Sequence, residues 1–197
     1  VNKIAWLRNA RGGDYPSIKE FSKICIDSGC QGITVHPRDD MRHINPEDVK
    51  ILKELTKESE VEFNIEGNPF SEQKGKYPGF LQLIKSYQPD QCTLVPDASS
   101  QLTSDHGWDL LGDNSRLASL IKTIKTYGSR VSLFMDPSEE GISKAKEVGA
   151  DRIELYTGPY AEAVKHQKGI KDLIKQYSKA DKHAHNLGLG VNAGHDL

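Results

Sequence analysis

Six short apolar runs, each stopping at a polar or ionisable residue, limit the possible folds of this chain more than any other feature. They are Ile33-Thr34-Val35-His36, Phe63-Asn64-Ile65-Glu66, Thr93-Leu94-Val95-Pro96-Asp97, Leu133-Phe134-Met135-Asp136, Ile153-Glu154-Leu155-Tyr156-Thr157 and Gly190-Val191-Asn192-Ala193-Gly194-His195. In a ring of parallel strands, reactive side chains lie where each strand passes into the following loop. The pattern therefore predicts an enzyme built on such a ring.

Helical patterns separate these runs. Asn45-Pro46 has the form of an N-cap followed by a proline at the first helical position. The helical residues are Ile18, Phe21 and Cys25; Val49, Leu52 and Leu55; Leu117, Leu120, Ile121 and Ile124; residues 137–148; and Ile170, Leu173, Ile174 and Tyr177. Strand and helix therefore alternate, at the spacing of βα units.

The alternation predicts an α/β fold, a (β/α)8 TIM barrel, forming a single domain over residues 1–197. We expect the stub of a first strand at residues 1–6, which makes the run at 190–195 the seventh strand. Because the fold needs eight strands and roughly 250 residues, we expect the chain to be truncated after the seventh strand. By the same comparison, we expect it to lack a few residues before Val1.

Composition excludes several classes of partner. The chain has 197 residues, of which 36% are hydrophobic and 27% charged, and its formal net charge is −2. Such a chain has no overall basic field to attract nucleic acid or an anionic membrane, and no apolar run approaches the roughly 20 residues that span a bilayer. Cys25, Cys30 and Cys92 form no CxxC pair, which favours the reducing cytoplasm over a disulfide framework.

Side-chain alternation within the strands predicts a polar interior. Successive residues of a strand face opposite ways, so Asn64 and Glu66 share one face while Phe63 and Ile65 share the other. We expect the apolar face to meet the helices and the polar face to line the barrel. Because burying polar groups is costly, a polar lining indicates a bound polar substrate.

His36 and Glu66 end two successive runs and are the first candidates for catalysis. His36 precedes a loop that carries Arg38, Arg42 and His43. Histidine titrates near neutral pH and guanidinium groups bind phosphate. A solvated charged loop is the structural alternative for His36, and an ion pair with an arginine is the alternative for Glu66. The places of both residues at strand ends favour catalysis.

Three further segments carry candidate residues. Glu154 lies mid-strand, where a structural ion pair competes equally with a catalytic role. His195 and Asp196 follow small residues that let a ligand approach the backbone, although a plain turn also accounts for Gly194. Arg11 lies in a loop expected after the first strand, where it could hold an anion together with glycine amides.

A metal site is the main chemical competitor. Five residues are acceptable ligands for zinc or iron: His36, His43, His195, Glu66 and Glu154. No HxH or HExxH spacing places two of them on one rigid element. The sequence therefore favours acid–base chemistry without a metal.

Seven segments, taken together and in order along nearly the whole chain, resemble the pyridoxine 5'-phosphate synthase family. They are Leu7-Arg8-Asn9-Ala10-Arg11-Gly12; Gly32-Ile33-Thr34-Val35-His36-Pro37-Arg38 with Arg42-His43-Ile44; Asn64-Ile65-Glu66-Gly67; Leu94-Val95-Pro96; Val131-Ser132-Leu133-Phe134; Glu154-Leu155-Tyr156-Thr157; and Val191-Asn192-Ala193-Gly194-His195-Asp196-Leu197. Each motif is weak evidence alone, but the combination is specific.

The resemblance implies a cytoplasmic homo-oligomeric (β/α)8 barrel, octameric in the family, in the deoxyxylulose-phosphate branch of vitamin B6 biosynthesis. The implied reaction condenses 3-amino-2-oxopropyl phosphate with 1-deoxy-D-xylulose 5-phosphate, giving pyridoxine 5'-phosphate, inorganic phosphate and water. This is a transferase-type condensation and ring closure with small phosphorylated substrates as partners and with no metal or organic cofactor. Such a reaction needs proton transfers at several atoms, which suits several acid–base groups.

The resemblance also implies roles for individual residues. The catalytic positions are His36 and Glu66 as proton acceptors, His195 as a proton donor, and Glu154 assisting an elimination. The substrate-binding positions are Arg38, His43 and Thr103 for deoxyxylulose phosphate, Arg11 and Asp196 for the aminoketone phosphate, and Asn2 and Lys3, which stand where many members carry Asp-His. A Gly-His pair of the eighth strand, which binds phosphate in the family, is expected beyond Leu197.

Two other functions stay open. A phosphosugar aldolase or epimerase on the same scaffold would need a Schiff-base lysine or a metal at a strand end, and none of the six runs ends in lysine. A phosphate-binding module without turnover would have no reason to keep His36, Glu66 and His195 together, because polar groups in a core are costly. Residues 68–77 form a long loop that receives no functional assignment.

Overall fold

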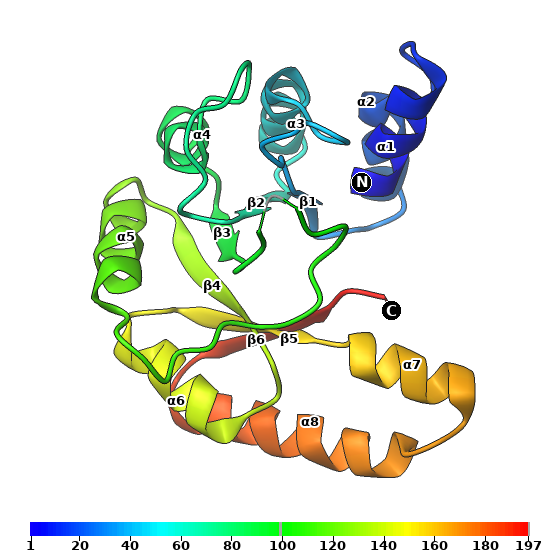
Figure 1. Ribbon diagram of the computed structural model, residues 1–197. Coiled ribbons are helices and arrows are strands. Elements are labelled where there is room, and N and C mark those ends of the chain that lie inside the picture. Colours follow the sequence, from blue (N-terminus) through cyan, green and yellow to red (C-terminus); the bar gives the residue numbers. More distant parts are fainter. Residues whose placement is uncertain (99, 197) are drawn as a thin grey trace. The chain divides into compact units, whose positions relative to one another are not determined.

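The computed structural model describes residues 1–98 and 100–196 and has an α/β fold (Figure 1). The strands found there are β1 (Gly32–Val35), β2 (Glu62–Gly67), β3 (Gln91–Leu94), β4 (Arg130–Met135), β5 (Arg152–Tyr156) and β6 (Gly190–Gly194). They hydrogen-bond in sequence order, β1-β2-β3-β4-β5-β6. The pairs β1–β2, β4–β5 and β5–β6 are parallel. Each of the six apolar runs therefore contributes to a strand, as predicted, although in the third run only Thr93 and Leu94 lie in β3.

The predicted helices are confirmed. Two helices precede β1, and the others lie between strands. They are α1 (Asn2–Arg11), α2 (Ile18–Asp27), α3 (Pro46–Glu58), α4 (Phe80–Tyr87), α5 (Ser115–Thr126), α6 (Glu139–Glu147), α7 (Gly158–His166) and α8 (Ile170–Asn186). Asn45 caps α3 in a capping box: its side chain accepts from the Asp48 amide and the Asp48 carboxylate accepts from the Asn45 amide. Helices α4 and α7 are not among the helices predicted from the sequence.

The prediction of a first strand at residues 1–6 is wrong, because these residues belong to α1. A short apolar run cannot be assigned to strand or helix by periodicity alone. The buried residues of α1 are Ala5 and Arg8, three positions apart, whereas Trp6 is 58% exposed. The inward face is thus small and polar, so the apolar residues misled the assignment. Residues 190–194 consequently form the sixth strand of the described chain, not the seventh.

The helix also replaces the expected loop around Arg11. Helix α1 continues through Arg11 and ends at Gly12, whose φ of 66° and ψ of 64° are left-handed. Glycine adopts this conformation without the steric cost that a side chain brings, which makes it a common helix end. Arg11 therefore lies exposed in the last helical turn.

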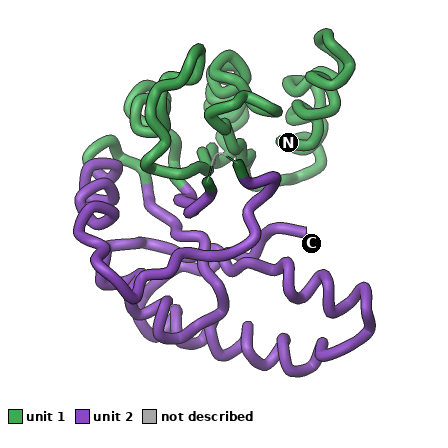
Figure 2. Tube along the Cα trace, in the orientation of Figure 1, with its two compact units in different colours: residues 1–92, 98–100, 126–129 green, residues 93–97, 101–125, 130–197 purple. Residues whose placement is uncertain are grey.

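Two compact units make up the chain, coloured separately in Figure 2. Unit 1 holds Val1–Cys92 and two short later segments, and unit 2 holds most of the chain from Thr93 onward. In unit 1, α3 packs against β1 and β2 and also against α2 and α4. In unit 2, α8 packs against α6, α7 and β6, while α6 also contacts β4. The single domain stays a prediction.

Each unit has an apolar strand face toward its helices. In unit 1, Phe63 is fully buried and its ring centroid lies 5.9 Å from Nζ of Lys53 on α3. On the opposite face, the Asn64 amide donates to Thr34 Oγ1 at 3.2 Å. In unit 2, the Met135 side chain reaches toward Gly141 of α6. The predicted alternation of faces is therefore seen in unit 1, and in unit 2 an apolar strand residue faces a helix.

No helix in the described part of the chain is long and apolar enough to cross a membrane. Leu197, the last residue of the seventh resembling segment, lies outside the described residues.

Candidate active site

The structure pairs His36 with Glu66 at the ends of two adjacent strands. Thr34 is aligned with Asn64 in the register of β1 and β2, so His36 and Glu66, two residues further on, share their face. His36 Nδ1 lies 3.3 Å from Glu66 Oε1, and the two side chains are 8% and 15% exposed. A buried carboxylate beside an imidazole can accept a proton from it or stabilise its charged form. We call His36, Glu66, Arg38 and His43 the first cluster.

His43 and Arg38 complete the first cluster in the loop after β1. The rings of His36 and His43 are 6.0 Å apart between centroids, at an interplanar angle of 62°. Arg38 is buried. Burial lowers the pKa of His43 to about 4, and the charges of His36, Arg38 and Arg42 act in the same direction, whereas Asp40 opposes them. His43 is therefore uncharged near neutral pH.

The substrate-binding candidates on α1 differ in their exposure and contacts. Asn2 is half-buried, and its Oδ1 accepts from the His36 backbone amide at 2.9 Å, so it holds the end of β1 beside the first cluster. Lys3 and Arg11 are exposed. Of the three, Asn2 is the residue for which a hydrogen bond to His36 is seen.

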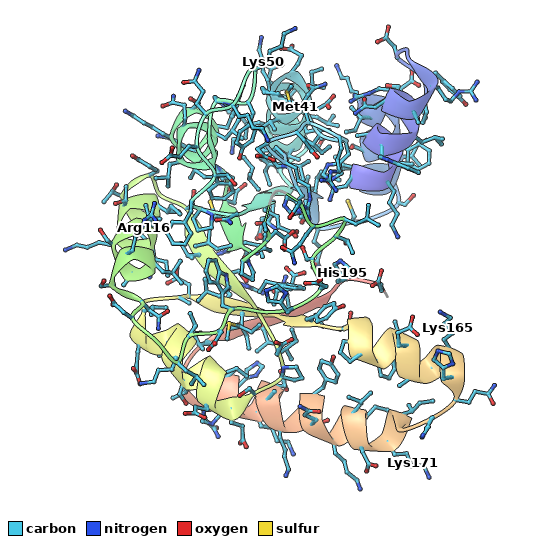
Figure 3. The ribbon with its side chains drawn as sticks, in the orientation of Figure 1. Met41, Lys50, Arg116, Lys165, Lys171 and His195 are labelled. Atoms are coloured by element: carbon cyan, nitrogen blue, oxygen red, sulfur yellow. The ribbon has the colours of Figure 1, made fainter. Side chains whose placement is uncertain are left out.

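His195 lies at the end of β6 in unit 2, where Figure 3 labels it. Its Nδ1 is 2.8 Å from Asp196 Oδ2 and its Nε2 is 2.8 Å from Thr103 Oγ1. Because a carboxylate only accepts, Nδ1 carries the proton, and Nε2 accepts from the Thr103 hydroxyl when the ring is neutral. His195 and Asp196 have φ values of 75° and 61°, a strained backbone for non-glycine residues of the kind found at functional sites. We call His195, Asp196, Thr103 and Glu154 the second cluster.

Two aromatic rings support the imidazole of His195. The Tyr156 ring lies 5.4 Å from that of His195, edge-on at 80°, and the Phe134 ring lies 6.2 Å from it. Burial raises the pKa of Tyr156, and the carboxylates of Asp196 and Asp105 raise it further, so its hydroxyl stays protonated. Our sequence reasoning assigned no role to Tyr156. The sequence signal that could have identified Tyr156 is its position two residues after Glu154, which places both on the same face of the strand.

Glu154 lies in the middle of β5, on the face that it shares with Tyr156. Its carboxylate approaches Gly194 of β6 so closely that a Cβ at Gly194 would be 2.2 Å from Glu154 Oε1. Thr157 Oγ1 donates to the Gly194 carbonyl at 2.6 Å and also to the carbonyl of His195. The small residue before His195 therefore makes room for a carboxylate, and Thr157 fixes the turn.

A pocket of about 470 Å³ opens beside the second cluster. Its lining is Asp105, Tyr156, Gly158, Pro159, Ala161, Glu162, Lys165 and Asp196. Lys165, labelled on α7 in Figure 3, is paired with Glu162 at 3.2 Å. The carboxylates of Asp105 and Asp196 leave the lining acidic overall, which suits a ligand group that carries positive charge.

Across the described residues, no group of three or more histidine, cysteine, aspartate or glutamate side chains is arranged to hold a metal ion. The five residues considered as ligands belong instead to the two clusters.

Comparisons with known proteins point to one family. A family model described as pyridoxal phosphate biosynthesis protein PdxJ matches residues 1–197. The chain is 54% identical over 198 residues to the pyridoxine 5'-phosphate synthase of Xanthomonas axonopodis pv. citri (strain 306), covering 100% of this chain and 77% of that protein. The pyridoxine 5'-phosphate synthase of Xylella fastidiosa (strain M23) is 51% identical over 198 residues, covering 100% and 75%.

Comparison with solved structures concerns the fold alone. Deoxyribose phosphate aldolase from Aeropyrum pernix matches with a TM-score of 0.56 at 15% sequence identity, covering 89% of this chain and 68% of that chain. The similarity is consistent with an α/β fold that forms part of a TIM-like barrel.

Proposed function

This chain belongs to the PdxJ family of pyridoxal phosphate biosynthesis proteins, and on that premise we propose that it condenses 3-amino-2-oxopropyl phosphate with 1-deoxy-D-xylulose 5-phosphate. The products are pyridoxine 5'-phosphate, inorganic phosphate and water. The chain is thus an enzyme of vitamin B6 synthesis, and its chemistry consists of joining an amine to a ketone and closing an aromatic ring. Each of these steps moves protons between carbon, nitrogen and oxygen.

The contact between His36 and Glu66 carries the proposal. Two proton acceptors lie 3.3 Å apart and mostly out of solvent. In such an environment, one group can remove a proton from a substrate carbon, and the charge of the other group then stabilises the protonated form of the first. We assign His36 and Glu66 as the proton acceptors of the condensation.

His195 is the proposed proton donor. The imidazolium form would donate from both nitrogens, and the Asp196 carboxylate at 2.8 Å from Nδ1 stabilises its charge. Thr103 at Nε2 marks the direction in which the transferable proton points. Glu154, one strand away, assists the elimination steps of ring closure.

Substrate binding is divided by charge. Arg38 and His43 are assigned to deoxyxylulose phosphate together with Thr103, because guanidinium groups bind phosphate through charge-assisted hydrogen bonds. Arg11, Asp196, Asn2 and Lys3 are assigned to the remaining substrate contacts. The acidic pocket beside Asp196 suits the ammonium group of the aminoketone phosphate, since opposite charges attract.

The finer architecture belongs to the same proposal. The parallel strands in sequence order support a (β/α)8 barrel. We also propose a single domain, a homo-oligomer such as the octamer of the family, and the cytoplasm as the compartment.

Incubation of the full-length protein with both phosphorylated substrates tests the function. We expect release of inorganic phosphate and formation of a pyridoxine-like chromophore, and neither when one substrate is left out. Absence of both signals with verified substrates would remove the proposal. Substrate trapping by borohydride, or loss of activity to a chelator, would favour an aldolase instead; tight binding by calorimetry without turnover would favour a binding module.

A His36→Ala variant tests the assignment of the catalytic base. We expect turnover to fall by about 10³-fold or more, because a positioned acid–base group contributes roughly 10²–10⁴-fold. The far-ultraviolet circular dichroism spectrum should stay unchanged. Turnover at the wild-type rate would show that His36 is misassigned.

A further inference from the structure

A buried ion pair joins α1 to the start of α3. Arg8 donates to both carboxylate oxygens of Asp48, with 2.5 Å from Nη1 to Oδ1 and 2.8 Å from Nη2 to Oδ2. Both residues are buried, Arg8 being 9% exposed and Asp48 3%. Asp48 Oδ2 also accepts from the backbone amide of Asn45 at 3.0 Å. A bidentate pair has a fixed geometry. The pair therefore fixes the position of the Arg8 guanidinium relative to the start of α3.

Two side chains of α1 reach from this anchor to the main chain of His43. Asn9 Nδ2 donates to the carbonyl oxygens of His43 at 2.8 Å and of Arg42 at 3.1 Å. Arg8 Nη2 donates to the same His43 carbonyl at 3.3 Å and to Asn9 Oδ1 at 2.9 Å. Because Arg8 only donates, it orients the Asn9 amide with its NH₂ group toward the loop. The His43 carbonyl is therefore held by two donors from α1.

The ring of His43 has a single tautomer in this arrangement. The backbone amide of Ile44 donates to His43 Nδ1 at 2.9 Å. A backbone N–H can only donate, so Nδ1 has a free lone pair and the ring proton lies on Nε2. This hydrogen bond depends on the backbone angles between His43 and Ile44, which the His43 carbonyl helps to define.

We propose that Arg8 and Asn9 are positioning residues that hold the main chain at His43, so that its imidazole stays in the Nε2–H form and offers one uncharged donor to an oxygen of the sugar phosphate. The identity of this substrate rests on the function proposed above. The tautomer itself is a property of the free protein. An uncharged donor contributes direction, whereas the charge that attracts phosphate comes from Arg38 in the same loop.

An Asn9→Asp variant isolates the proposed contact. Aspartate keeps an acceptor for Arg8 but has no NH₂ group to donate to the His43 carbonyl. Asn9 is exposed, so the variant is expected to fold. Asn114→Asp is the matched control, because the Asn114 amide also donates to two carbonyls, Leu110 at 2.7 Å and Gly112 at 2.9 Å, in a different loop.

Nuclear magnetic resonance of the full-length protein, with ¹⁵N-labelled histidine and no substrate, measures the tautomer directly. In the wild type and in Asn114→Asp, we expect the His43 signals of an Nε2–H imidazole at about pH 7. In Asn9→Asp we expect a mixture of tautomers. We also expect the KM for deoxyxylulose phosphate to rise about 10-fold, the effect of losing one well-aligned hydrogen bond, while the KM for the aminoketone phosphate stays within about 2-fold.

The two readouts separate this inference from the proposed function. Unchanged His43 signals in a folded Asn9→Asp variant would overturn the positioning role, whatever happens to turnover. Equal rises in both KM values would also contradict it, because a general loosening of the site would then explain the result. A wild-type protein that shows the tautomer but turns over neither substrate would refute the proposed function. It would not contradict the positioning of His43 by Arg8 and Asn9.

Discussion

At the residue scale, the candidate site holds polar groups in places where water is scarce. His36 and Glu66 are 8% and 15% exposed in their side chains, and each lies at a strand end directly after a buried apolar residue. A buried carboxylate is costly unless it has a partner. The imidazole supplies that partner, so the pair can be stable as well as reactive.

Replacing Glu66 by glutamine separates the proton acceptor from the shape of the side chain. Glutamine keeps the size of glutamate but cannot accept a proton near neutral pH. We expect kcat to fall about 10²–10⁴-fold, with little change in the midpoint of urea denaturation. Glu54→Gln, the same change at an exposed position of α3, is the control and should retain wild-type kcat. Full activity of Glu66→Gln would show that its carboxylate is not the acceptor.

At the scale of elements, strand ends supply the residues and the following loops are fixed by local contacts. The loop that carries Thr103 is anchored at two points: the Trp108 indole donates to the Leu94 carbonyl at 2.8 Å, and the Trp108 amide donates to the Phe134 carbonyl at 2.9 Å. Ser104 Oγ donates to Asp97 Oδ2 at 2.8 Å in the buried interior. Thr103 therefore meets His195 from a loop that unit 2 holds firmly.

Gly107 is the test of that anchoring. A Cβ at this position would be 2.2 Å from the Asp136 amide nitrogen and 2.5 Å from the Met135 carbonyl carbon, and backbone atoms cannot move aside cheaply. We expect Gly107→Ala to destabilise the protein by about 1–3 kcal/mol, as overpacking does, and to lower turnover by displacing Thr103. At Gly112 a Cβ would have no neighbour within 4 Å, so Gly112→Ala should leave the urea midpoint unchanged. Equal midpoints for the two variants would contradict the packing argument.

At the scale of the whole molecule, the environment of His43 couples the first cluster to folding stability. Its pKa is about 4 in the folded protein, below the value of 6.5 for a free histidine. Between these values the unfolded chain binds more protons than the folded one, so this stabilisation is fully present above about pH 6.5 and is lost as the pH falls toward 4. Burial is the main cause of the lowered pKa of His43; the charges of His36, Arg38 and Arg42 add to it, and the Asp40 carboxylate opposes it.

The predicted pH dependence can be measured by urea denaturation. Across the window from about pH 6.5 to about pH 4, we expect His43 to contribute a loss on the order of 1–3 kcal/mol, after allowing for the part of the ring that solvent reaches. A His43→Gln variant removes the titrating group, so its free energy of unfolding should fall less steeply over the same window. Parallel curves for the wild type and the variant would show that His43 does not carry the coupling.

The positions of strands and helices followed from the sequence because their signals are local. Alternation, apolar runs and caps such as Asn45 depend on residues a few positions apart, and all six strands and the capped start of α3 were predicted from them. The candidate residues were also visible, since a polar residue at the end of a buried run is a local feature. Helix α1 was not predicted, because its buried face consists of Ala5 and Arg8 and not of a row of large apolar residues.

Which candidates touch was decided by the tertiary structure alone. Thr103 and His195 are 92 residues apart in the chain, and Arg8 meets Asp48 across 40 residues. Neither contact produces a periodic pattern in the sequence, because a hydrogen bond between distant side chains constrains only the two residues that form it. The sequence by itself therefore determined the kinds of groups and the strand ends that carry them. The pairings, the tautomer of His43 and its lowered pKa depend on the packing around them, which brings remote charges and donors within a few ångströms.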